Sequence, residues 1–60
     1  MTRPKDIDLD IWLKTDAYCL AQLKTMGQTI EALGTDRYSQ MVYDIAKHSQ
    51  QIRNLDRRLR

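Results

Sequence analysis

The sequence predicts an all-α fold in which two amphipathic helices, joined by a tight turn, form an antiparallel hairpin. Two apolar stripes at helical spacing, and one strong turn signal between them, carry this prediction. The 60 residues then form a single helical-hairpin domain. We expect a first helix over about 8–33, a turn at 34–35 and a second helix over about 36–58.

The first stripe follows a heptad pattern that starts at Leu9. Its two seam positions hold Leu9, Asp16, Leu23 and Ile30 on one side and Trp12, Cys19, Met26 and Leu33 on the other. Leu13 and Leu20 widen the stripe, as a core-facing helix requires. Asp8 and Asp10 suit the first turn of this helix, because carboxylates are favoured at a helix N-terminus.

The turn signal is Gly34, which can adopt the left-handed conformation that ends a helix, followed by Thr35, which can cap the next one. The second stripe follows this turn. One seam position holds Tyr38, Ile45, Ile52 and Leu59, and the other holds Met41, His48 and Leu55, with Val42 beside them. This pattern predicts the second helix.

A different interpretation applies to residues 6–13, where Ile7, Leu9, Ile11 and Leu13 alternate with mostly acidic residues. This period is also typical of a half-buried strand. With a strand there, the order becomes strand, helix, turn, helix, and the segment from Gly34 to Val42 resembles the turn and second helix of the ribbon-helix-helix family. That resemblance implies a dimeric DNA-binding repressor or antitoxin, although its DNA-facing strand would carry three carboxylates. Aspartate favours a helix start over a strand, so we expect a helix from about Asp8 or Asp10.

Size and stripe width predict an oligomer. A chain this short buries only about 60% of the surface that its unfolded form exposes, and its single cysteine excludes an internal disulfide. Each stripe is also wider than one partner helix can cover. We therefore expect a dimeric four-helix bundle. Its expected core residues are Trp12, Leu20, Leu23, Ile30, Met41, Ile45, Ile52 and Leu55.

Two polar residues, Asp16 and His48, occupy seam positions, where such residues can set register and oligomeric state. Within one hairpin, uninterrupted helices would place Asp16 level with about Arg53 and His48 level with about Ala21. In an antiparallel dimer, Asp16 of one chain would approach His48 of the other. We expect such a pair to tighten the dimer as the pH falls from about 8 to 6.

The surface residues indicate protein–protein binding. Tyr18 and Tyr43 fall outside the stripes, and tyrosine is enriched at binding hot spots. The net charge of +2 hides an acidic start and a basic end. The partner-binding candidates are Tyr18, Tyr43, Arg53, Arg57, Arg58 and Arg60. The arginines favour either an acidic partner or phosphates, so RNA binding by the bundle face is a further alternative, but Asp8 and Asp10 are expected to neutralise much of their field.

The sequence favours no enzyme. Cys19 and His48 are the only cysteine and histidine, and they cannot supply the ligands of a zinc site or a complete nucleophilic triad. We expect no cofactor, metal, small-molecule substrate or membrane span, and a cytoplasmic location. The predicted function is that of a small regulatory or adaptor protein that binds itself and another protein, with weak nucleic-acid binding at most.

Overall fold

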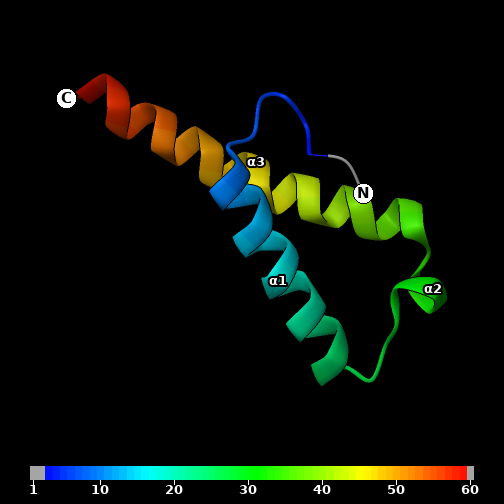
Figure 1. Cartoon of the computed structure of the whole chain (residues 1–60). Helices are drawn as coiled ribbons and strands as arrows, with labels where there is room; N and C mark the ends of the chain where they lie inside the picture. The colour runs from blue at the N-terminus through cyan, green and yellow to red at the C-terminus, as the bar shows by residue number, and fades with distance from the viewer. Residues whose placement is uncertain (1–2, 60) are drawn as a thin grey trace.

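A computed structural model of the chain describes residues 3–59, and all regular structure in this range is helical. Helix α1 spans Leu9–Thr25, α2 spans Ile30–Leu33, and α3 spans Thr35–Leu59. The two long helices pack against each other, and α2 packs on α3. Figure 1 shows α1 beginning beside the middle of α3, with α2 and its linkers joining their other ends. The predicted all-helical fold with two long, contacting helices is confirmed.

Residues 6–13 form no strand and helix begins at Leu9, so the predicted alternative order of strand, helix, turn and helix is wrong. Asp8 occupies the N-cap position of α1, and Asp10 lies in its first turn. The alternation also fails as a strand face, because Ile7 is buried whereas Leu9 is 56% exposed. Helix therefore begins where the aspartates favour it.

The predicted end of the first helix is wrong, because α1 stops at Thr25 rather than near residue 33. Gly27 follows the helix with a φ of +70°, a left-handed conformation that costs glycine little. The Gly27 amide donates to the Lys24 carbonyl (3.1 Å), and the Gln28 amide donates to the Leu23 carbonyl (2.8 Å). These two bonds form a Schellman motif, which satisfies the carbonyls at the end of α1.

The short helix α2 is also missing from the sequence-based prediction. Thr29 begins it by accepting a hydrogen bond on its side-chain oxygen from the Ala32 amide (3.1 Å). Gly34, with a φ of +105°, then ends it, as the predicted turn requires. Thr35 is not a cap but the first residue of α3, whose first backbone bond runs from the Tyr38 amide to the Gly34 carbonyl.

The contact between α1 and α3 uses residues spaced by four on each helix. The buried side chains of α1 include Ile11, Thr15, Cys19 and Leu23, and those of α3 are Tyr38, Val42, Ala46 and Gln50. A row spaced by four is inclined to its helix axis, so two such rows interlock with the axes inclined by roughly 50°. This packing explains why the helices diverge in Figure 1 instead of lying side by side along their length.

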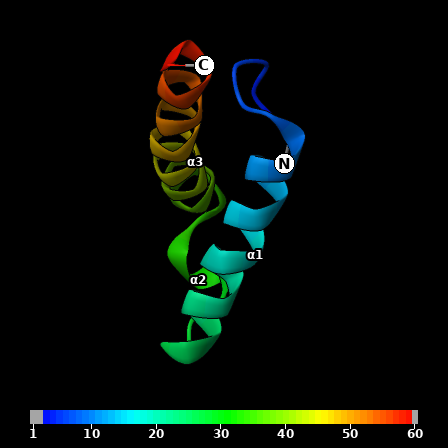
Figure 2. The same cartoon turned by 90° about the vertical axis from the view of Figure 1, so that its left-hand side faces the viewer.

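The segment before α1 completes the core. Ile7 is 1% exposed and packs in one cluster with Trp12, Val42 and Ala46. Arg3 donates from Nη1 to the Ile7 carbonyl at 2.7 Å, which holds this segment in a turn. The result is an elongated molecule of 42 × 21 × 14 Å. Figure 1 shows the C-terminal turns of α3 extending beyond the rest of the fold, and Figure 2 views the molecule from that side, with α3 next to α1.

Candidate functional site

Helix α3 carries a second, largely apolar row whose members are exposed, except for Met41, which is partly buried. We call this row the α3 stripe, and it consists of Met41, Ile45, His48, Ile52, Leu55 and Leu59. Its spacing alternates between four and three residues, which is the seam pattern of a coiled coil. At 100° per residue, the stripe lies about 120° around the helix from the row that packs on α1. The two rows therefore serve different contacts.

Exposure increases along the α3 stripe toward the C-terminus. Ile45 is 38% exposed, Ile52 and Leu55 are each 57% exposed, and Leu59 is 88% exposed. Full burial of one such side chain contributes about 1.5–3 kcal/mol. A short chain with a small core thus leaves a substantial apolar surface in water along one helix, and such a surface marks an interaction site more often than isolated apolar residues do.

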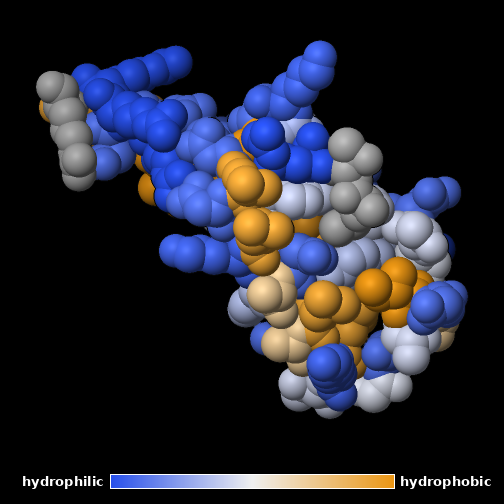
Figure 3. All heavy atoms as spheres, viewed as in Figure 1, coloured by the Kyte–Doolittle hydropathy of each residue, from blue (hydrophilic) through white to orange (hydrophobic). Residues whose placement is uncertain are grey.

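A smaller apolar surface follows α1. Leu9 and Leu13 are 56% and 57% exposed and lie one turn apart, with half-buried Leu20 two turns further along the same side. Figure 3 shows apolar side chains in a band along α1 that continues toward α2. This band lacks the regular seam spacing of the α3 stripe, because Asp16 interrupts it.

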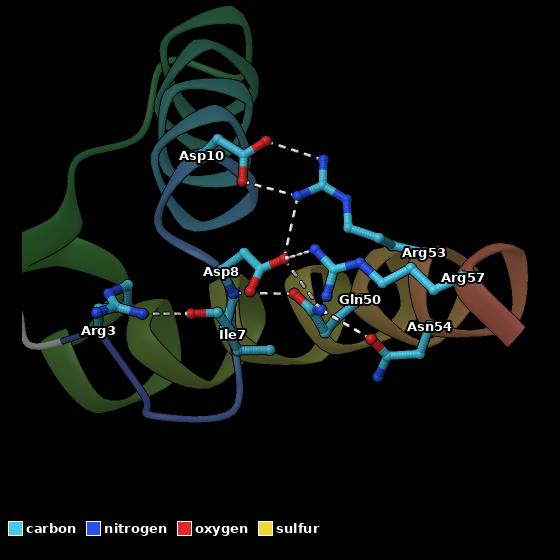
Figure 4. A network of polar contacts seen from close by, with 8 residues as sticks. All are labelled: Arg3, Ile7, Asp8, Asp10, Gln50, Arg53, Asn54 and Arg57. Carbon is cyan, nitrogen blue, oxygen red and sulfur yellow. Dashed lines mark hydrogen bonds and ion pairs between the residues drawn. The ribbon is translucent and has the colours of Figure 1, made fainter.

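A polar cluster connects the start of α1 to the middle of α3 (Figure 4). Arg53 donates from both terminal nitrogens to the two carboxylate oxygens of Asp10, each at 2.8 Å, and from Nη1 to Asp8 Oδ2 at 3.2 Å. Arg57 reaches the same Asp8 oxygen at 3.1 Å. A bidentate contact between arginine and a carboxylate restricts the relative orientation of the two side chains in addition to pairing their charges. The cluster thus sets where α1 crosses α3.

Gln50 is the buried member of this cluster, at 5% exposure. Its Oε1 accepts from the Asp8 backbone amide at 2.9 Å, and its Nε2 donates to Asn54 Oδ1 at 3.1 Å and to Asp8 Oδ2 at 3.4 Å. The Asp8 carboxylate therefore faces α3 and makes no cap hydrogen bond to α1. The Gln50 side chain thus provides an acceptor for the backbone N–H of Asp8, where the N-terminal segment enters α1.

The cluster shifts the pKa values of its acidic members. Hydrogen bonding from Arg53 lowers the pKa of Asp10 to about 2. Hydrogen bonds from Arg53, and then from Gln50, also hold the pKa of Asp8 below its ordinary value. The hydrogen bond to Asp10, followed by the one to Asp8, raises the pKa of Arg53. Both carboxylates are consequently ionised in the fold at neutral pH.

The predicted partner-binding residues that the structure describes fall into three groups. Arg53 and Arg57 are engaged within the chain by the acidic start of α1, as their charges indicated. Tyr43 is half-buried, and its hydroxyl donates to Asp6 at 3.2 Å. Tyr18 and Arg58 are exposed. Arg60 lies outside the described residues.

The residues predicted to form the oligomer core differ in how far they are buried within the single chain. Trp12 and Leu23 are 6% and 2% exposed, so they belong to the core of the single chain rather than to a surface that a second chain could reach. Leu20, Ile30 and Met41 are partly buried against this core. Ile45, Ile52 and Leu55 are exposed and form the centre of the α3 stripe. Leu59, which the heptad pattern indicated, extends it.

The prediction that Asp16 stands level with about Arg53 is wrong. Arg53 lies beside Asp10, and Asp16 instead accepts a hydrogen bond from the Tyr38 hydroxyl at 2.5 Å. The offset arises because residues 26–34 do not continue the first helix. Burial, followed by the hydrogen bond and charge of Asp16, raises the pKa of Tyr38. His48 is exposed on α3.

Cys19 and His48, the residues considered for nucleophilic or metal chemistry, lie on different helices. Cys19 is buried, and burial raises the pKa of its thiol, whereas His48 is exposed on another helix. Residues 3–59 contain no cluster of potential metal ligands. A surface depression lined by Gln51, Asn54, Leu55 and Arg58 belongs to α3 alone, so no second element encloses it. Among the helices that the structure describes, none has the length and apolar character to cross a bilayer.

Comparisons with protein-family models, curated proteins and solved structures find no match to this chain.

Proposed function

We propose that this chain is a small helical protein-interaction module that associates with a second copy of itself through the α3 stripe. The observation that carries the proposal is the coiled-coil spacing of exposed Ile45, Ile52, Leu55 and Leu59 on a helix that projects beyond the core. In such a dimer, two α1–α3 pairs join through their α3 helices into an assembly of four long helices. Its biological role is that of a regulatory or adaptor protein.

The charge distribution favours a protein partner over nucleic acid. Arg53 contacts Asp8 and Asp10, and Arg57 contacts Asp8, so these two arginines already have carboxylate partners. Phosphate binding would have to compete with these contacts. Among residues 3–59, the exposed stripe residues Ile45, Ile52, Leu55 and Leu59 meet no such competition.

Sedimentation equilibrium of two matched variants tests the proposal. Leu55 and Leu13 are the same residue type at the same 57% exposure, but only Leu55 belongs to the α3 stripe. We expect the parent protein to dimerise in the micromolar range, Leu55→Ser to weaken the dimer by at least about tenfold, and Leu13→Ser to leave it nearly unchanged. A parent protein that stays monomeric at several hundred micromolar, or equal effects of the two variants, would overturn the proposal.

A further inference from the structure

We propose that the two copies pair through α3 in an antiparallel orientation, centred between His48 and Ile52, with Asp44 of each chain opposite Arg58 of the other. This inference rests on the proposed self-association and specifies its geometry. The evidence is the order of apolar and charged residues along the exposed side of α3.

The seam residues define the apolar layers. Ile45, Ile52 and Leu59 occupy one heptad position, and Met41, His48 and Leu55 occupy the other. In an antiparallel pair, the layers match Ile45 with Leu55, Ile52 with His48, and Leu59 with Met41 of the second copy. Every seam residue in 41–59 then has a partner.

Charges beside the seam distinguish the two orientations. Asp44, Gln51 and Arg58 recur every seven residues along one edge of the α3 stripe. In the antiparallel pair this edge meets itself, so Asp44 lies opposite Arg58 twice and Gln51 lies opposite Gln51. In a parallel pair, the same edge would place Asp44 near Ser49 and Gln51 near Asp56. The antiparallel orientation therefore gains two ion pairs where the parallel one gains none.

His48 favours the same orientation. A parallel pair would place the two His48 side chains in one layer at the middle of the apolar seam. The antiparallel pair instead gives each His48 an isoleucine neighbour, so the two imidazoles do not share a layer. A polar residue in a seam commonly selects one arrangement in this way.

The required side chains are accessible in the single chain. Arg58 is exposed and makes no ion pair with residues 3–59. Asp44 is exposed and accepts from Gln40 on Oδ1 at 2.8 Å, which leaves Oδ2 for a second donor. Because the α3 stripe lies about 120° from the row that packs on α1, a second copy can bind without displacing α1.

Disulfide cross-linking of the full chain tests the orientation. One sample mixes ¹⁵N-labelled Asp44→Cys protein with unlabelled Arg58→Cys protein, and a second contains Leu55→Cys protein alone, each at a concentration where sedimentation shows that the variant is dimeric. An antiparallel pair brings residues 44 and 58 together, whereas a parallel pair separates them by about 21 Å along the axis. A parallel pair brings the two residues at position 55 together, whereas the antiparallel pair separates them by about 15 Å. The parent protein, whose Cys19 is 1% exposed, is the control for background oxidation.

We expect the mixed-mass 44–58 dimer to form and the 55–55 dimer to be absent. A 55–55 link without a 44–58 link, or neither link in a protein that sediments as a dimer, would overturn the antiparallel geometry while leaving self-association intact. A monomer in sedimentation would overturn the proposed function itself.

Charge reversal provides a second readout. We expect Asp44→Arg to weaken the dimer by about 3- to 30-fold, because each dimer loses two ion pairs, and we expect Asp44→Arg combined with Arg58→Asp to restore most of the affinity. Asp36→Arg makes the same charge change on α3 outside residues 41–59 and should have little effect. Equal weakening by the single and double variants would contradict the pairing of Asp44 with Arg58.

Discussion

Arg53 of α3 holds Asp10 of α1 through two parallel hydrogen bonds, each 2.8 Å long. The same guanidinium contacts Asp8, so one arginine bridges the N-cap and the first turn of α1. Because α1 and α3 cross at an inclined angle, this bridge determines where on α3 the first helix begins. The exposed side chains of Ile52, Leu55 and Leu59 lie outside this cluster.

We expect this cluster to make the fold sensitive to acid. The folded pKa of Asp10 is about 2, and that of Asp8 is lowered, against an ordinary value of 3.8. Stabilisation from a lowered carboxylate pKa is fully present above the unfolded value and is lost as pH falls through the folded value. Stability from this cluster should therefore decline between about pH 5 and pH 2.

Urea unfolding followed by circular dichroism across this range measures the effect. Asp10→Asn should be less stable than the parent near pH 6, and the difference should shrink toward pH 2. A difference that stays constant with pH would contradict the assigned ion pair.

Tyr38→Phe should destabilise the fold by about 1–2 kcal/mol, because the hydroxyl of the buried Tyr38 donates a hydrogen bond to the Asp16 carboxylate. A hydrogen bond to a charged group contributes more to stability than one between neutral groups. Tyr18→Phe is the matched control, since Tyr18 is 54% exposed on the same helix as Asp16. It should change the free energy of unfolding by less than about 0.5 kcal/mol. Equal effects of the two substitutions in urea unfolding would count against the Tyr38–Asp16 contact.

Gly27→Ala should destabilise the fold by about 1–2 kcal/mol, because an L-residue pays this cost in the left-handed conformation that Gly27 adopts at φ +70°. The space around Gly27 is open, so the loss comes from the backbone and not from a clash. Gly27→Asn should cost less, since asparagine tolerates this conformation. Thermal unfolding of both variants checks the order, and a Gly27→Ala protein as stable as the parent would show that α1 ends differently.

The sequence was sufficient to predict the helical class, the start of α1 and the break at Gly34. It was not sufficient to predict that α1 ends at Thr25, because Ile30 and Leu33 continue the heptad pattern across the break. The sequence nevertheless contains a signal for this break. Gly27 can end a helix, and Thr29, two residues later, can cap the next one.

The functional surface was partly predictable. The heptad pattern identified Ile45, Ile52 and Leu55, but it grouped them with Tyr38, which is buried against α1. Two apolar rows overlap on α3, one spaced by four and one alternating between four and three. Which row packs within the chain depends on the crossing angle of the helices, and that angle follows from both surfaces together. The role of Gln50 was missed, because a buried amide in a polar run carries no periodic signal.

The most direct test of the central claim is an isotope-filtered nuclear Overhauser experiment on a mixture of labelled and unlabelled parent protein. Only contacts between different chains appear in such a spectrum. We expect cross-chain contacts between the methyl groups of Ile45 and Leu55, with none from Leu13. Cross-chain contacts confined to α1, or none at a concentration where the protein sediments as a dimer, would contradict self-association through the α3 stripe.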